Sequence, residues 1–207
     1  MPHFELETSL GATTGQVVAG IDEVGRGPLA GPVVAGAVCF PGGAVPSDLA
    51  ERLDDSKRLT PSLRELLARE IHAQARTAIG IASVAEIDRL NILEASLLAM
   101  TRAAEGLGVA LDAILVDGRH IPKLPCPATA VVGGDGISLS IAAASIVAKV
   151  HRDELMRAAS MDHPGYGWET NAGYGTAAHL EALRSLGVTE MHRRSFRPVR
   201  EALALNY

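Results

Sequence analysis

The sequence predicts an α/β protein with a central mixed five-stranded sheet flanked by helices and a small helical element at its C-terminus. Apolar runs of strand length alternate with longer segments whose apolar residues recur at helical spacing. The first two apolar runs are separated by a short glycine-rich connection, which predicts an antiparallel pair, whereas the later runs are separated by helices. This order of segments favours a sheet that mixes antiparallel and parallel pairing.

The first two strands are expected to form a hairpin. Residues 16–22 (QVVAGID) and 32–40 (PVVAGAVCF) are apolar and bounded by turn residues. The connecting segment 25–32 is rich in glycine and proline, and residues 41–46 read as a loop after the second strand. Because consecutive strands with a short connection pair side by side, we place these two next to each other in the sheet.

A helix is expected between the second and third strands. Thr60 is suited to the N-cap and Pro61 to the first helical position, and the helix should run to about Gln74. Residues 76–84 (RTAIGIASV) predict the third strand. Residues 86–107 carry apolar side chains at helical spacing and predict one long helix.

Two short strands and two helices complete the expected elements. Residues 113–116 and 128–132 predict buried strands, residues 140–160 a helix that begins with small residues, and residues 176–186 a further helix.

A single domain is expected over residues 1–207, with a core at about 16–160 and a C-terminal helical element at about 161–207. The chain has 207 residues, of which 47% are hydrophobic, so it can bury a sizeable core. The formal net charge of −5 gives no support to a general nucleic-acid binder, so any such contact must be local. Two distant cysteines, no visible signal peptide and no apolar run of about 18 residues predict a cytoplasmic protein without a membrane span.

Four carboxylates follow predicted strand ends. Asp22 and Glu23 end the first strand, Asp117 follows the fourth, and Asp135 lies just after the fifth. Ligands of open α/β sheets gather at such ends, and oxygen ligands without histidine or cysteine favour Mg²⁺ or Mn²⁺. Neighbours on a regular strand point to opposite faces, so Asp22 and Glu23 should share a site only if the strand breaks at Glu23 or if Glu23 offers its backbone carbonyl.

A series of motifs in order along the chain resembles the type 2 ribonucleases H, specifically bacterial ribonuclease HII. The segment DEVGRGPLAGP at 22–32 resembles the opening motif of that family. The other matching segments are DDSKRL at 54–59, VDG at 116–118, PKLP at 122–125, GD at 134–135, AASIVAKVHRD at 143–153, GYGT at 173–176 with His179-Leu180, and HRRSF at 192–196.

The resemblance implies the ribonuclease H fold and an endonuclease that cuts on the 5′ side of a ribonucleotide. It implies action on RNA–DNA hybrids and at single ribonucleotides in duplex DNA, hence ribonucleotide removal from DNA. By match of position, the metal ligands are Asp22, Glu23, Asp117 and Asp135. With them we expect two-metal-ion catalysis by Mg²⁺ or Mn²⁺ and products that carry a 3′-hydroxyl and a 5′-phosphate.

The same resemblance implies how the ribonucleotide is recognised. Gly25, Arg26 and Gly27 match the loop that detects its 2′-hydroxyl, and Tyr174 matches a tyrosine that packs at that sugar. Only the 2′-hydroxyl separates RNA from DNA at a given position, and glycines let backbone groups come close to it. Taken without the other motifs, the glycines would read as a plain tight turn and Tyr174 as a core or surface aromatic residue.

Several further residues could either contact the substrate or have a purely structural role. Ser56 and Lys57 could bind a backbone phosphate, or they could simply be solvated residues in the segment that leads into a helix. Ser145 and Lys149 are four residues apart, so both could face substrate from one helix, or the small residues around Ser145 could serve packing alone. The basic run at 192–200 could contact DNA or anchor the C-terminal element. The histidines expected to be structural or substrate-adjacent are His163, His179 and His192.

Three rival functions remain distinguishable. One is an ordinary hybrid-cleaving ribonuclease H that needs a run of ribonucleotides. A second is a non-catalytic nucleic-acid-binding protein of the same fold, which the retained acids disfavour. A third is a phosphatase of small substrates. We expect a monomer that binds nucleic acid and carries no visible clamp-binding peptide.

Overall fold

The computed structural model describes residues 1–205, and its centre is one five-stranded mixed sheet in the order β3-β2-β1-β4-β5. Strands β1 and β2 form the predicted antiparallel hairpin, β3 joins β2 antiparallel, and β4 and β5 continue from β1 in parallel. The predicted fold class is therefore confirmed. The strands are β1 (Val18–Val24), β2 (Val33–Cys39), β3 (Arg76–Ala82), β4 (Ala113–Asp117) and β5 (Ala128–Val131).

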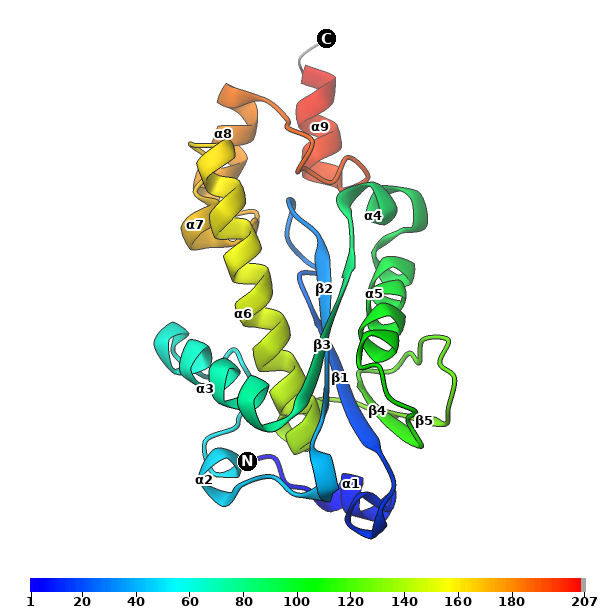
Figure 1. Ribbon diagram of the computed structural model, residues 1–207. Coiled ribbons are helices and arrows are strands. Elements are labelled where there is room, and N and C mark those ends of the chain that lie inside the picture. The colour runs from blue at the N-terminus through cyan, green and yellow to red at the C-terminus, as the bar shows by residue number, and fades with distance from the viewer. Residues whose placement is uncertain (206–207) are drawn as a thin grey trace.

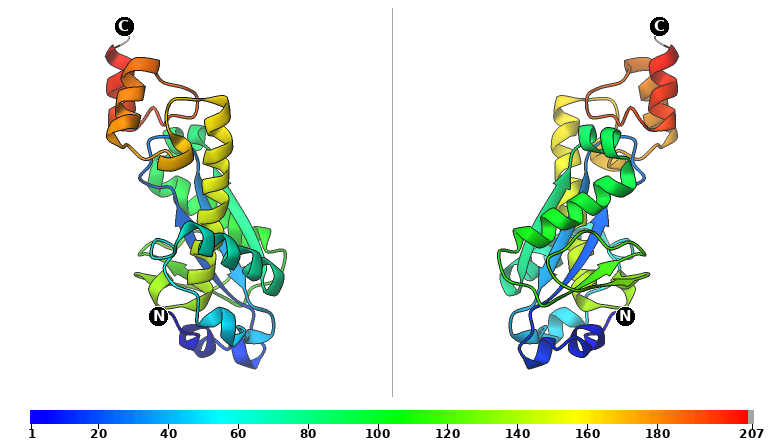
Figure 2. Two further views of the ribbon diagram at one scale, coloured as in Figure 1. Left: turned by 90° about the vertical axis from the view of Figure 1, so that its left-hand side faces the viewer. Right: turned by 90° about the vertical axis from the view of Figure 1, so that its right-hand side faces the viewer.

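Helices cover both faces of the sheet (Figure 1). Helix α6 (Leu139–Asp162) lies along one face together with α3 (Pro61–Gln74), and α5 (Ile92–Gly106) covers the other. The remaining helices are α1 (Glu5–Ser9), α2 (Ser47–Ala50), α4 (Val84–Leu90), α7 (Trp168–Asn171), α8 (Ala177–Leu186) and α9 (Arg197–Leu205). Figures 1 and 2 show α7, α8 and α9 gathered at one end of the molecule, far from α1 and α2.

The close packing of α6 on the sheet depends on two strand glycines. A Cβ atom at Gly20 of β1 would lie 2.3 Å from the backbone carbon of Ser140, and one at Gly36 of β2 would lie 2.4 Å from the Ala144 carbonyl oxygen. Ala142, Ala143 and Ala144 are fully buried in this contact. The small residues at the start of α6 therefore serve helix–sheet packing, since no larger side chain fits there.

A buried carboxylate holds the N-terminus of α6. Glu7 of α1 is fully buried, and its Oε1 accepts hydrogen bonds from the Ser138 and Ser140 hydroxyls and from the Ser140 backbone N–H. A negative charge at a helix N-terminus is favourable because the first N–H groups point toward it. This interaction fixes the N-terminal segment to the start of α6.

The predicted single helix over 86–107 is wrong, because the segment forms α4 and α5 with a break at Asn91. Asn91 has φ = 74°, outside the helical region, and its side-chain oxygen accepts hydrogen bonds from the Leu93 and Glu94 N–H groups. With ψ = 166° this is a strained backbone conformation for a residue other than glycine, and the cap that its side chain gives the new helix offsets part of the cost. The predicted start of α3 is confirmed, because the Thr60 hydroxyl accepts from the Leu63 N–H and Pro61 is the first helical residue.

The C-terminal element, of which residues 206–207 lie outside the described part, has an aromatic and histidine core of its own. Trp168 Nε1 donates to His179 Nε2 at 3.1 Å, and His192 Nε2 lies 3.1 Å from the same atom. The Thr189 N–H donates to His192 Nδ1, which requires that nitrogen to be unprotonated. Burial and the neighbouring His179 and His163 lower the pKa of His192 to about 4.

This histidine predicts an acid-sensitive C-terminal element. His192 titrates near pH 6.5 when unfolded and near pH 4 when folded, so its contribution to stability is complete above about pH 6.5 and is lost as the pH falls toward 4. The loss should be on the order of 3 kcal/mol. Urea unfolding between pH 7 and pH 4 should therefore show a steeper loss for the wild type than for His192→Gln.

The exposed His3 supplies the matched control, because His3→Gln removes an imidazole that is not buried. His3→Gln should retain the wild-type pH dependence. An unchanged slope in His192→Gln would contradict the assignment of acid sensitivity to this network.

Candidate active site

Three carboxylates meet where β1 and β4 end. Asp22 and Glu23 lie on β1, and Asp117 is the last residue of the parallel neighbour β4, which pairs Ile21 with Val116. One carboxylate oxygen from each of the three lies within 4.8 Å of the others. The Gly134 N–H donates to Asp117 Oδ1 at 2.7 Å and thereby orients that carboxylate.

Of the two conditions considered for a shared site, a break of β1 at Glu23 is not observed. The strand continues to Val24, and Glu23 still pairs with Ala35 of β2. Asp22 follows the face of Gly20, which packs on α6, whereas Glu23 lines a recess with Ser96 and Leu97 of α5. The two carboxylates therefore reach one site from opposite faces of the sheet end, which the longer glutamate side chain permits.

Asp135 lies beside this group rather than within it. It belongs to the short 3₁₀ turn Gly134–Gly136 after β5, and Lys57 Nζ lies 3.9 Å from its Oδ2. The pKa of Asp135 is raised by burial and by the charges of Asp55 and Asp117. The fourth predicted acid is thus close enough to interact electrostatically with Asp22 and Asp117.

The charged forms of the clustered acids are disfavoured by burial and by mutual repulsion. Burial, and then the charges of Glu23, Asp117 and Asp135, raise the pKa of Asp22 well above its ordinary value. Burial also raises the pKa of Glu23, although Arg26 Nη1, at 3.1 Å from Glu23 Oε1, acts in the opposite direction. Carboxylates held this close repel one another unless a cation lies between them.

The donor set fits a divalent cation. Glu23 Oε2 is buried and has no hydrogen-bond partner within the described residues, which leaves a carboxylate oxygen for a ligand. Carboxylate oxygens are the ligands that Mg²⁺ and Mn²⁺ prefer. Asp22, Glu23 and Asp117 could therefore hold an ion directly, with Asp135 at its margin.

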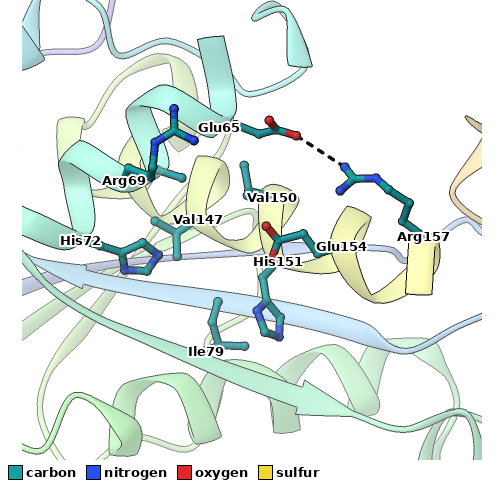
Figure 3. Close-up of a pocket in the computed structure, with 10 residues that line it drawn as sticks. Glu65, Arg69, His72, Ile79, Val147, Val150, His151, Glu154 and Arg157 are labelled. Atoms are coloured by element: carbon teal, nitrogen blue, oxygen red, sulfur yellow. Dashed lines mark hydrogen bonds and ion pairs between the residues drawn. The ribbon is translucent and has the colours of Figure 1, made fainter. Parts of the chain in front are cut away.

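Two of the acids, Glu23 and Asp117, line a small recess. The hollow beside Glu23 and Asp117 has a volume of about 20 Å³, and Arg119 and His120 also line it. Sequence reasoning did not single out these two residues, although they directly follow the Asp117-Gly118 pair. A larger hollow of about 310 Å³ lies elsewhere, between α3, α6 and β3 (Figure 3). Pockets that enclose small molecules have volumes of about 300–1,000 Å³, so the small recess suits a large substrate of which only a part lies at the acids.

The glycine loop and Tyr174 lie side by side beside the acids. The Leu29 N–H donates to the Gly173 carbonyl, and a Cβ atom at Gly27 would lie 3.5 Å from Tyr174 Cε1. The side chain of Tyr174 is 44% exposed. Residues that are distant in the sequence therefore form one surface next to the carboxylates.

Gly25 and Gly27 lack a side chain for different reasons. Gly25 has φ = 93°, and its Cβ would lie 2.1 Å from Arg152 Nε, so the buried arginine occupies the space. At Gly27 the nearest atom to a Cβ is in the Tyr174 ring, at an ordinary contact distance. The space at Gly27 opens toward Tyr174, whereas that at Gly25 is filled from within.

The other predicted substrate residues are less exposed to substrate than expected. Ser145 is buried, and its hydroxyl donates to the Ala142 carbonyl. Lys149 Nζ lies 2.6 Å from Asp153 Oδ1 in an ion pair along α6. Ser56 is also buried, whereas Lys57 is exposed and points toward Asp135. Of these residues, only Lys57 is brought to the acids by a contact in the structure.

The basic run at 192–200 is divided between the interior and the surface. Arg193 is fully buried, and its guanidinium donates to backbone carbonyls of the glycine loop, including that of Gly25. Arg194, Arg197 and Arg200 are exposed. Of the two roles considered for the basic run, contact with DNA and a structural anchor, the position of Arg193 fits the structural anchor.

Comparison with known proteins identifies the family. The model of the family described as Ribonuclease HII matches residues 19–199. The chain belongs to the ribonuclease HII family. Ribonuclease HII of Rhodospirillum rubrum is 59% identical over 206 residues, covering 99% of this chain and 93% of its own. Ribonuclease HII of Gluconobacter oxydans is 58% identical, covering 98% of this chain and 97% of its own.

Solved structures agree with this assignment. The crystal structure of ribonuclease H2 from Pyrococcus horikoshii matches with a TM-score of 0.77 at 25% identity, covering 92% of this chain and 98% of its own. Members of the ribonuclease HII family are ribonuclease H endonucleases that depend on a divalent metal, and this chain is such an enzyme. No helix among residues 1–205 is long and apolar enough to span a membrane.

The electrostatics of the acids predict a stability effect. Asp22→Asn removes one buried charge but keeps an oxygen that can accept from the Glu23 N–H, as Asp22 Oδ1 now does at 2.7 Å. At neutral pH without metal, the variant should be more stable than the wild type, because asparagine avoids the burial and the repulsion that penalise the Asp22 charge. Because the folded pKa of Asp22 is raised, this advantage should shrink as the pH falls toward 4.

Thermal unfolding without Mn²⁺ measures the stability difference between the two proteins, and unfolding with Mn²⁺ measures how much the cation stabilises each of them. Mn²⁺ should raise the melting temperature of the wild type more than that of Asp22→Asn. An equal increase in the two proteins would place the cation elsewhere.

The two glycines predict different costs of substitution. Gly25→Ala combines a left-handed φ with overlap against Arg152 and should destabilise by more than about 3 kcal/mol. Gly27→Ala meets no such overlap and should stay within about 1 kcal/mol of the wild type in urea unfolding. Gly42→Ala is the matched control, because Gly42 has φ = 69° with no atom within 4 Å of the added Cβ. Equal costs for Gly25→Ala and Gly42→Ala would exclude the overlap with Arg152.

Proposed function

We propose that this ribonuclease HII hydrolyses the phosphodiester on the 5′ side of a ribonucleotide, both in RNA–DNA hybrids and at single ribonucleotides embedded in duplex DNA. The products carry a 3′-hydroxyl and a 5′-phosphate, and the role is removal of ribonucleotides from DNA. The observation that carries the proposal is the contact between the Gly27 region and Tyr174 directly beside the acidic site. This arrangement supports reading of one sugar next to the bond that is cut.

Asp22, Glu23, Asp117 and Asp135 hold two Mg²⁺ or Mn²⁺ ions in this proposal. When bound, such ions activate water and stabilise charge on the departing oxygen. The unpartnered Glu23 Oε2 supports direct ligation through the side chain. The exposed Lys57, 3.9 Å from Asp135, adds a positive charge that balances the carboxylates as the phosphate approaches.

The recognition surface selects the nucleotide. Gly27 leaves space beside the Tyr174 ring, and Tyr174 packs on the sugar of the ribonucleotide while the backbone of Gly25, Arg26 and Gly27 detects its 2′-hydroxyl. Because the 2′-hydroxyl lies on the nucleotide after the cut, it marks the site and takes no part as nucleophile. Ser56, Ser145 and Lys149 support the substrate region from within rather than by the direct contacts first considered.

The small acidic recess favours a polymer over a small phosphorylated substrate. With about 20 Å³, it cannot enclose a whole small molecule. One chain carries both the acids and the recognition surface, which supports action as a monomer.

Cleavage of a labelled duplex with one ribonucleotide tests the proposal. With Mg²⁺ or Mn²⁺, the wild type should make one cut just 5′ of the ribonucleotide, and none with a chelator or in all-DNA duplex. Asp22→Asn and Asp117→Asn should reduce turnover by about 10⁴-fold or more while remaining folded by circular dichroism. Asp162→Asn, at an exposed aspartate away from the site, is the matched control and should cut like the wild type.

Each other outcome has a distinct meaning. Cleavage only within a long hybrid would leave the acidic site in place and reject recognition of a single ribonucleotide. Substantial turnover by Asp22→Asn or Asp117→Asn would remove that residue from the catalytic group. Binding without any metal-dependent cleavage would favour the non-catalytic alternative.

A further inference from the structure

Two buried arginines lie beneath the glycine loop. Arg152 of α6 and Arg193, which follows α8, are both 0% exposed, and within residues 1–205 neither forms an ion pair with a carboxylate. Backbone carbonyls accept the hydrogen bonds of both guanidinium groups. Arg152 donates to Ala30, Pro32 and Ala172, and Arg193 donates to Gly25, Arg26, Gly31 and Pro32.

The carbonyls of the loop thus replace water around the two charges. Burial and repulsion by Arg152 lower the pKa of Arg193 to about 9, so Arg193 is still charged at neutral pH. A buried charge without a carboxylate is costly unless hydrogen bonds satisfy it. If the carbonyls of Gly25 or Arg26 turned away, part of a buried guanidinium would lose its partners. The charge therefore holds the loop in one conformation.

This conformation determines where the loop N–H groups point. The peptide bonds of the described chain are all trans, and in a planar trans peptide the N–H lies opposite the preceding C=O. The Gly25 carbonyl points to Arg193 Nη2 and the Arg26 carbonyl to Arg193 Nη1. The N–H groups of Arg26 and Gly27 then point away from the buried Arg193, and the half-exposed Tyr174 lies next to Gly27.

The second arginine joins this loop to the segment that carries Tyr174. Arg152 Nη1 donates to the Ala172 carbonyl at 2.9 Å, and the Leu29 N–H donates to the Gly173 carbonyl at 2.8 Å. The turn that carries Arg193 is fixed in its own right, because Asp88 Oδ1 and Oδ2 accept from the Ser195 and Arg194 N–H groups. The position of Arg193 therefore depends on α4 as well as on the loop.

We propose that Arg193 is a positioning residue for ribonucleotide recognition: it draws the carbonyls of Gly25 and Arg26 inward and so presents the N–H groups of Arg26 and Gly27 to an acceptor oxygen of the ribonucleotide. The inference rests on the proposed function and adds a buried residue that does not touch substrate. Lysine keeps the charge but lacks the planar fork, so it cannot reproduce four hydrogen bonds to carbonyls.

The test compares Arg193→Lys with Arg194→Lys in the full-length chain. The two substitutions are chemically identical and adjacent, but Arg193 is buried and Arg194 is exposed. Steady-state kinetics on a duplex with one ribonucleotide should show kcat/KM reduced about 100-fold by Arg193→Lys, because small displacements of a positioning group have effects of that size. Arg194→Lys, which keeps the surface charge, should stay within about threefold.

A readout of the loop itself separates positioning from general stability. In protein labelled with ¹⁵N-glycine, the Gly27 amide signal should shift in Arg193→Lys and stay in place in Arg194→Lys, at a temperature where both are folded. Mn²⁺ binding, measured by calorimetry, should be the same in both. Asp88→Asn loosens the turn that carries Arg193 without altering the guanidinium group. It should change the Gly27 signal and kcat/KM in the same direction as Arg193→Lys but to a smaller extent. This variant replaces Arg193→Lys in the test if Arg193→Lys does not fold.

The proposal would be overturned if Arg193→Lys had the kcat/KM of the wild type and an unchanged Gly27 signal. It would also be overturned if the loss of rate in Arg193→Lys equalled its loss of folded protein. If the wild type does not cut beside a single ribonucleotide, the proposed function fails. The Gly27 signal still decides whether Arg193 sets the loop, because that measurement needs no turnover.

Discussion

The close approach of α6 to the sheet is the constraint on which the rest of the structure depends. It is possible only because Gly20 and Gly36 have no side chains, so that the helix backbone lies directly against β1 and β2. At its first turn α6 is fixed by the buried Glu7, close to the acids, and further along it supplies Arg152 beneath the glycine loop. One rigid helix therefore sets the distance between the carboxylates and the surface beside Tyr174.

Much of this arrangement could be predicted from local sequence. Apolar runs predicted the five strands, and Thr60 with Pro61 predicted the start of α3, because these signals depend on near neighbours. The helix break at Asn91 was missed although an asparagine cap is a local signal, since the helical spacing of apolar residues continues across it. The family resemblance implied that the glycine loop and Tyr174 serve one nucleotide, but no local pattern predicts that residues so distant in sequence lie side by side.

The arginines show what a sequence cannot reveal. Arg193 and Arg194 are identical neighbours in a basic run, yet one is buried among carbonyls and the other is exposed. Their difference depends on a loop near the other end of the chain. Likewise, Gly25 and Gly27 look equivalent in the motif, but one makes room for Arg152 and the other for the surface beside Tyr174. Two residues of the same type in one motif can therefore be required for different structural reasons.

The small size of the acidic recess has a topological consequence. The recess that Glu23 and Asp117 line has a volume of about 20 Å³ and is too small to be a tunnel for a strand, so a strand does not have to be threaded through the protein from a free end. A backbone can be engaged sideways at any point along its contour. Under the proposed function, a covalently closed circle that contains a single ribonucleotide is then as accessible to the enzyme as a linear fragment.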